Sequence, residues 1–136
     1  MAKMTQRMKN VFEKIPAVVV ATASSEGIPN AVLVGAKKII DDETILLSDQ
    51  FLNKTLRNLK ENPRVAITIW ENFEGYQIKG TASIETSGKI FDDTAKWAEE
   101  LGKAINFPLK TKSAVVIKIT EIYGVSPGPK AGAKLA

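Results

Sequence analysis

Residues 53–65 read Asn-Lys-Thr-Leu-Arg-Asn-Leu-Lys-Glu-Asn-Pro-Arg-Val, and this stretch organises the chain because it joins a helix start to a strand. Asn53 is a favourable N-cap residue, which would place Lys54 and Thr55 in the first helical turn. Pro63 disfavours helical conformation in the residue before it, so the helix is expected to end there. Val65–Trp70 then alternates as a strand does.

The first turn of this helix is a candidate anion site. Backbone N–H groups there lack intrahelical partners, and such turns favour a phosphate group. Lys54 adds a positive charge and Thr55 a hydroxyl donor beside those N–H groups. A capped surface helix that carries a lysine and a threonine is also common. The residues alone therefore leave two interpretations open, a phosphate site and an ordinary helix start.

The composition narrows the possible chemistry. The chain has 136 residues, which predicts one domain, and it contains no Cys and no His. These absences exclude the usual zinc sites, thiolate-held iron–sulfur clusters, a Cys nucleophile and a Ser-His-Asp triad. Redox chemistry would need a bound organic cofactor. The sequence predicts no metal site, and no residue can be named as a catalytic acid or base.

Targeting signals and net charge give little further information about function. No apolar run of membrane-spanning length and no secretory leader are visible, so a cytoplasmic protein without a membrane partner is expected. The net charge of +4 is spread along the chain and suits a solvated surface. By itself it does not distinguish an anionic ligand from a nucleic acid.

The hydrophobic pattern predicts a mainly β fold with flanking helices. Ala17–Ala23 is a continuous apolar run, typical of a strand covered on both faces, and Tyr76–Glu85 alternates cleanly. Roughly six strands at hairpin spacing favour a small antiparallel barrel with the helices outside it. The expected helices are Thr5–Ile15, the one starting at Asn53, and Ile90–Ala104; the further expected strands are Asn30–Ala36, Thr44–Asp49 and Ser113–Thr120.

The domain is expected to span residues 1–125, followed by a tail. Residues 126–136 are rich in Pro and Gly and have no core-forming pattern, so this tail is expected to be extended or disordered. Gly35 lies inside a predicted strand, where it indicates either a bulge or the close approach of a flat ring to the backbone. Ser48 and Asp49 lie at the exit of the next strand, beside the candidate anion site.

The order of these elements resembles the pyridoxamine 5′-phosphate oxidase-like family of FMN-binding split β-barrels. The likeness spans roughly residues 10 to 122 and is greatest to the small FMN-binding proteins of this family. Its most specific parts are Lys54-Thr55, Asn58-Leu59, Asn62-Pro63-Arg64-Val65 and Gly75-Tyr76-Gln77-Ile78-Lys79-Gly80.

This resemblance implies a split antiparallel β-barrel that binds FMN as a homodimer. The implied phosphate ligands are Lys54 and Thr55, where the larger oxidases carry two basic residues; the missing charge would weaken binding by about 1 kcal/mol or more. Gln77 would reach the flavin from the second subunit. The remaining implied flavin contacts are Leu33, Val34 and Gly35 along the ring, and Ser48 and Asp49 at the strand end.

The chain departs from the larger oxidases at its C-terminus. Their C-terminal segment carries tryptophan and arginine that help bind pyridoxal phosphate, and nothing in residues 117–136 matches it. Pyridoxamine phosphate oxidase activity is therefore not expected. The Pro/Gly-rich tail could instead cover the flavin of the partner subunit.

The expected function is that of a redox flavoprotein. It would be either an oxidoreductase that uses NAD(P)H or an electron-transfer protein served by a redox partner, and the sequence does not separate the two. The alternatives are a split barrel for haem or a deazaflavin, a nucleic-acid-binding barrel, and a dimer without cofactor. The lack of His argues against ordinary haem ligation, and few aromatic residues alternate with Lys and Arg as nucleic-acid binding would require.

Overall fold

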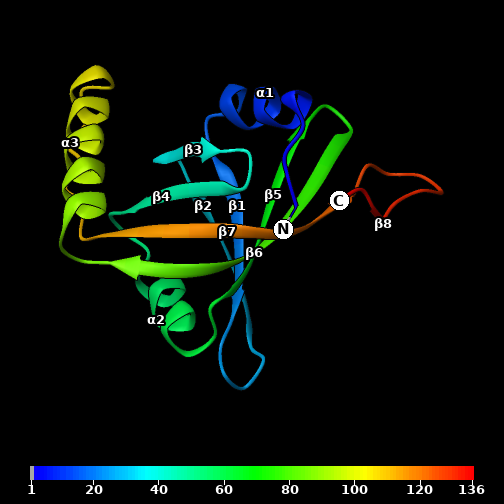
Figure 1. The fold of residues 1–136 in the computed structure, drawn as a ribbon, viewed down its shortest axis with the longest axis horizontal. Helices are drawn as coiled ribbons and strands as arrows, with labels where there is room; N and C mark the ends of the chain where they lie inside the picture. Colours follow the sequence, from blue (N-terminus) through cyan, green and yellow to red (C-terminus); the bar gives the residue numbers. More distant parts are fainter. Residues whose placement is uncertain (1) are drawn as a thin grey trace.

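The strands of the protein form a single curled antiparallel sheet, flanked by helices (Figure 1). This computed structural model describes residues 2–136. The helices are α1 Gln6–Lys14, α2 Asn53–Glu61 and α3 Lys89–Ala104. The strands are β1 Val18–Ala23, β2 Pro29–Val34, β3 Lys37–Asp41, β4 Thr44–Asp49, β5 Arg64–Glu71, β6 Glu74–Glu85, β7 Ser113–Gly124 and β8 Ala133–Lys134.

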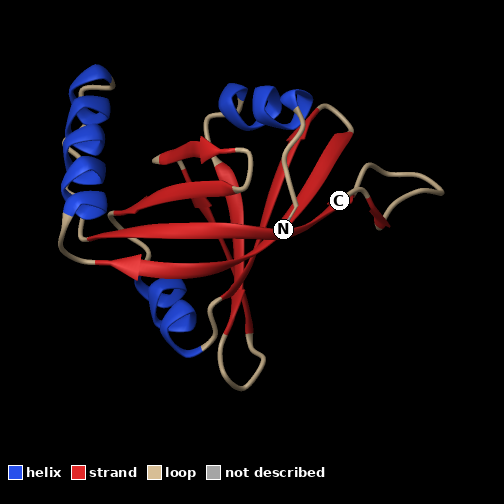
Figure 2. Ribbon diagram, in the orientation of Figure 1, coloured by secondary structure: helices blue, strands red, loops and turns tan. Residues whose placement is uncertain are grey.

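The sheet is curled, and a short link joins the strands at its two edges. The strand order is β2-β1-β5-β6-β7-β4-β3, with β8 paired to β7. Figure 2 shows the strands together in red, with the helices around them in blue. The edge strands β2 and β3 are separated in sequence only by Gly35 and Ala36, yet they do not pair with each other. This arrangement is the mainly β, split antiparallel barrel that the sequence predicts, and the split lies between β2 and β3.

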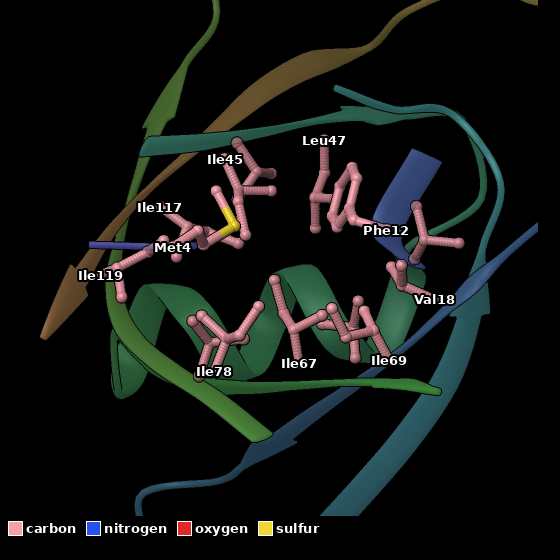
Figure 3. Packing of buried hydrophobic residues seen from close by; sticks show 14 of the residues in the cluster. Met4, Phe12, Val18, Ile45, Leu47, Ile67, Ile69, Ile78, Ile117 and Ile119 are labelled. Carbon is pink, nitrogen blue, oxygen red and sulfur yellow. The ribbon is translucent and has the colours of Figure 1, made fainter. Parts of the chain in front are cut away.

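The core fills the inside of the curled sheet. Side chains from strands on opposite sides meet there, among them Ile45, Ile67, Ile78 and Ile117, all fully buried (Figure 3). α1 and α2 lie above and below the sheet in Figure 1, and both contribute to the same core, with Phe12 from α1 among the contributors. The ends of the barrel are therefore closed by helices, which leaves the outer faces of the strands for other contacts.

α3 lies apart from this core, against the outer side of β4 and β7 (Figure 1). It buries Thr94 and Ala98. None of the helices within residues 2–136 combines the length and the apolar character that a membrane crossing would require.

Two of the predicted boundaries are wrong near the split. Gly35 is not inside a strand, because the expected strand Asn30–Ala36 ends at Val34 and the chain crosses to the other sheet edge. The N-cap of α2 is Leu52, not Asn53, and no side-chain cap bond is made. The bend before α2 is instead held by Asp49, whose Oδ1 accepts a hydrogen bond from the Leu52 N–H at 3.0 Å.

The prediction of an extended or disordered tail is also wrong. The chain after β7 turns back and pairs with β7 through β8. Gly132 donates its N–H to Gly124 O at 2.7 Å, and Leu135 donates to Ile122 O at 2.8 Å. The turn needs residues free of a Cβ, because Gly128 and Gly132 both have positive φ. The role suggested for this tail over a partner's flavin stays a prediction.

Candidate functional site

A narrow cleft lies at the split of the barrel. It has a volume of about 90 Å³, and its walls come from the end of β2, the Gly35–Ala36 link, the end of β4 and the loop into α2. Four of the predicted site residues line it together, namely Leu33, Val34, Gly35 and Ser48. We call this the split cleft.

The mouth of the split cleft is lined by apolar side chains, and backbone atoms form part of its wall. Leu33 and Phe51 both line it and are each 71% exposed, which is unusual for large apolar side chains. Val34 points into the core, so that only its backbone is left for the cleft. A Cβ added to Gly35 would meet only Pro16 O, at 3.5 Å, which is an ordinary contact. No group of the chain itself therefore requires glycine at position 35.

Buried hydrogen bonds fix the inner wall of the split cleft. Ser48 Oγ lies 2.7 Å from Thr111 Oγ1, and Gln50 Nε2 donates to Ser48 Oγ at 2.6 Å. The Asp49 carboxylate is 1% exposed. Besides the Leu52 N–H, it accepts a hydrogen bond from Ser113 Oγ at 3.0 Å. The Asp49 side chain thus ties β7 to the start of α2, and the Asp49 carbonyl oxygen accepts the Lys112 N–H at 2.8 Å. Asp49 itself does not line the split cleft.

A second groove begins on the other side of the α2 N-terminus. It has a volume of about 390 Å³ and includes Lys54, Arg57, Asn58 and Asn30 in its walls. The first hydrogen bond of the helix runs from Leu56 N–H to Leu52 O at 3.2 Å. The N–H groups before Leu56 therefore have no partner within the helix. We call this the helix-start groove.

The charges of the helix-start groove favour an anion. Lys54 and Arg57 are exposed cations one helical turn apart. The one carboxylate in its walls, Glu61, is already engaged: it accepts hydrogen bonds from the hydroxyl of Ser25 at 2.7 Å and from the N–H of Ser25 at 3.2 Å. These hydrogen bonds lower the pKa of Glu61.

Thr55 lies beneath this groove in a small polar cluster. Its side chain is 1% exposed, and Oγ1 accepts a hydrogen bond from Asn30 Nδ2 at 3.0 Å. Thr22 Oγ1 accepts from Asn58 Nδ2 at 3.0 Å and from Asn30 Nδ2 at 3.4 Å. The Thr55 hydroxyl keeps its own proton for donation. The cluster fixes α2 to β1 and β2 and so holds the helix start in place.

Sequence reasoning missed Asn30 and Arg57 as candidate site residues. Arg57 follows Lys54 by three residues, a spacing that puts both on one face of a helix, so a signal was present. Asn30 had no such signal, because its approach to Thr55 depends on how β2 packs on α2.

Gln77 lines neither the split cleft nor the helix-start groove. It lies on β6, opposite Thr68 of β5. The same row across the sheet continues through Val19 of β1 to Leu33 of β2. Three strand spacings, roughly 14 Å, therefore separate Gln77 from Leu33 along one face of the sheet. Within one chain Gln77 does not line the split cleft.

A family profile and a related protein each match nearly the whole chain. The sequence profile of the pyridoxamine 5′-phosphate oxidase family matches residues 4–126. The uncharacterized protein MJ0282 of Methanocaldococcus jannaschii is 44% identical over 137 residues, which cover 98% of this chain and 89% of that protein.

Solved structures share the fold over most of the chain. HupZ from Group A Streptococcus has a TM-score of 0.79 at 26% identity, covering 95% of this chain and 99% of that one. An FMN-binding protein from Syntrophomonas wolfei has a TM-score of 0.71 at 24% identity, covering 85% and 81%.

More distant structures with the same fold differ in their described ligands. An F420 reductase has a TM-score of 0.67 at 18% identity, covering 88% of this chain and 98% of that one. The heme storage protein HutZ from Vibrio cholerae has a TM-score of 0.62 at 12% identity, covering 90% and 94%. At such identities the likeness concerns the fold alone. The profile match and the 44% identical relative go further, and the chain belongs to the pyridoxamine 5′-phosphate oxidase family.

Proposed function

We propose that the protein is an FMN-binding flavoprotein of redox function that acts as a homodimer. The observation that carries this proposal is the position of the two recesses on either side of the α2 N-terminus. The split cleft offers an apolar mouth and exposed backbone, and the helix-start groove offers free N–H groups and two cations. A flat ring with a phosphate at the end of a short chain matches both recesses at once.

The size of the split cleft supports a dimeric site. At about 90 Å³ it is well below the roughly 300 Å³ or more of a usual ligand pocket, so one subunit alone cannot enclose a flavin ring. A second copy that covers the ring would complete the pocket. Gln77, which lies away from the split cleft in its own chain, would then serve the site of the partner subunit.

The outer face of β1 and its neighbours is the proposed dimer surface. Val19 and Ala21 are apolar and only half-buried there, although the continuous apolar run 17–23 predicts a strand covered on both faces. The row through Val19 continues with Thr68, Gln77 and Tyr123 on the neighbouring strands. All four side chains of this row are partly exposed, so a second copy of the chain would supply the cover.

FMN, when bound, would supply the hydride or electron chemistry. The residues of the chain would orient it. Lys54 and the first-turn N–H groups would hold the phosphate, and the backbone at Leu33–Gly35 would lie along the ring. Donor N–H groups aimed at the ring edge would stabilise negative charge on the reduced cofactor. The protein would serve either as an NAD(P)H-dependent oxidoreductase or as an electron carrier.

Other cofactors remain a second candidate. A deazaflavin also has a flat ring and a phosphate, so the same two recesses would accept it, and an F420 reductase shares the fold. Haem is less well matched, because the chain has no His to ligate its iron.

The test is a titration of the purified protein with FMN, followed by visible absorption, with size-exclusion chromatography of the same samples. The proposal expects flavin absorption that co-elutes with a dimer and saturates near the subunit concentration. F420 and haem serve as competitors. A protein that ignores FMN but binds either competitor would refute the cofactor assignment. Rapid reduction of the bound FMN by NADH or NADPH would indicate an oxidoreductase, and reduction by dithionite alone would indicate a carrier.

A further inference from the structure

A second, separate recess lies between α3 and the outer side of β3, β4 and β7. Its volume is about 430 Å³, within the range of small-molecule pockets. We call it the α3 groove. Its walls are mainly apolar and consist of Ile40, Leu46, Ile90, Trp97 and Val116, with Lys38, Asp41, Thr44, Asp93, Thr94 and Lys118 around them.

Strand register explains why these residues share one surface. Lys38 pairs with Leu46 and Leu46 with Val116, so the three side chains lie in a row on one face of the sheet. α3 adds Ile90 and Trp97, seven residues apart and therefore on the same side of the helix. The helix does not close the recess, since Ile40 is 51% and Ile90 is 48% exposed.

Three of the charged groups that line the α3 groove have ion-pair or hydrogen-bond partners within the chain. Asp93 Oδ2 is paired with Lys89 Nζ at 2.9 Å, and Asp41 Oδ1 accepts the Glu43 N–H at 2.9 Å. Lys118 Nζ donates to Thr44 Oγ1 at 2.9 Å.

Lys38 differs from the other charged groups of the groove. Within residues 2–136 it has no ion pair or side-chain hydrogen bond, and its Nζ lies 5.7 Å from the centre of the Trp97 ring. An ammonium group over an aromatic ring at the edge of an apolar recess is suited to an anion that carries an apolar body.

We propose that the α3 groove binds a small apolar carboxylic acid. The hydrocarbon part would lie on Leu46, Val116 and the Trp97 ring, and the carboxylate would pair with Lys38. The groove shares no residue with the split cleft, the helix-start groove or the proposed dimer surface. This site therefore does not depend on the proposed flavin function.

The test uses octanoate as the probe and the fluorescence of Trp97 as the signal. Trp70, the other tryptophan, lies on β5 outside the groove and is replaced in a Trp70→Phe background. We expect octanoate to change the Trp97 emission saturably. Octanamide, which has the same chain without the charge, should bind about tenfold more weakly or worse. Equal binding of the two probes, or no saturable change with octanoate, would overturn the proposal.

Variants then locate the charge that is responsible. Lys38→Gln should weaken octanoate binding about tenfold and leave octanamide binding unchanged. Lys96→Gln is the matched control, because Lys96 is an exposed lysine of α3 that does not line the groove. An equal effect of both substitutions would contradict the assignment to Lys38. FMN titration of the same variants should be unchanged, so a failure here is distinguishable from a failure of the flavin proposal.

Discussion

At the scale of single residues, two glycines have opposite reasons for lacking a side chain. A Cβ on Gly80 would lie 2.5 Å from Lys118 O and 2.8 Å from Ile117 Cγ2, so the close approach of β6 and β7 itself excludes it. Gly35 has no such neighbour, since the nearest atom, Pro16 O, would be 3.5 Å away. The requirement at Gly80 is internal to the fold. No contact within the chain requires glycine at position 35, so the proposed ring is the reason offered for a glycine there.

Alanine at these two positions should therefore affect different properties. Gly80→Ala is expected to lower the free energy of unfolding by about 2 kcal/mol, because backbone must shift to admit the methyl group. Gly35→Ala should change it by less than about 0.5 kcal/mol yet weaken FMN binding. Urea denaturation and FMN titration measure the two effects. Unchanged FMN affinity in Gly35→Ala would count against a ring beside residue 35.

The residues at the α2 N-terminus do not by themselves identify a ligand. Lys54 and Thr55 alone were compatible with an ordinary helix start, and it was the family resemblance that pointed to a flavin phosphate. In the structure, Thr55 is buried and accepts a hydrogen bond from Asn30. The Asp49 carboxylate accepts hydrogen bonds from Leu52 and Ser113. Such partners depend on tertiary packing, and no spacing in the sequence reveals them.

At the scale of elements, α1 is attached to the β5–β6 hairpin by a cluster of ion pairs. Arg7 Nη2 lies 2.8 Å from Glu71 Oε1 and 2.7 Å from Glu74 Oε1, and Lys14 also pairs with Glu71. Hydrogen bonds from Arg7, and then from the Tyr76 hydroxyl, lower the pKa of Glu74 to about 2. Pairing with Lys14 and Arg7 lowers the pKa of Glu71 as well.

This cluster should make stability depend on acid pH. The folded-state pKa of Glu74 is below its ordinary value of 4.5, so its stabilising effect is complete above about pH 4.5 and is lost as pH falls toward 2. Urea denaturation midpoints should fall across this window, and less steeply in Arg7→Gln. Lys89→Gln is a control, because Lys89 pairs with Asp93 on the surface of α3, away from this cluster. Identical slopes in Arg7→Gln and the unsubstituted protein would contradict this attachment.

Element prediction succeeded where the pattern is local and failed where the chain changes edges. Thr5 caps α1 through its side chain, and the alternation of β6 follows the predicted Tyr76–Glu85 pattern, with two residues of the expected turn, Glu74 and Gly75, added to the strand. β3 was missed because the run from Asn30 onward continues without a marked turn. The division into β2 and β3 comes from the curling of the whole sheet around the core, which sends the two strands to opposite edges.

At the scale of the whole molecule, the proposed dimer rests on the small volume of the split cleft and on the apolar residues of the outer face of β1. Thr68→Arg places a long cation in the middle of the proposed dimer surface, in the row between Val19 and Gln77. We expect this variant to elute as a monomer and to lose FMN, since the ring pocket would stay open. Ser83→Arg, an exposed residue of β6 outside that surface, should remain a dimer with FMN bound. A Thr68→Arg monomer with full FMN affinity would refute a site shared between subunits.

The most direct test of the account is the effect of Lys54→Ala on FMN compared with riboflavin, because the two ligands differ only by the phosphate assigned to the α2 N-terminus. Lys54 is exposed, so the substitution should leave the fold intact. The account predicts at least a tenfold loss of affinity for FMN, about 1.4 kcal/mol, and little change for riboflavin. Equal losses for both ligands, or no loss for FMN, would contradict it and move the phosphate away from this helix.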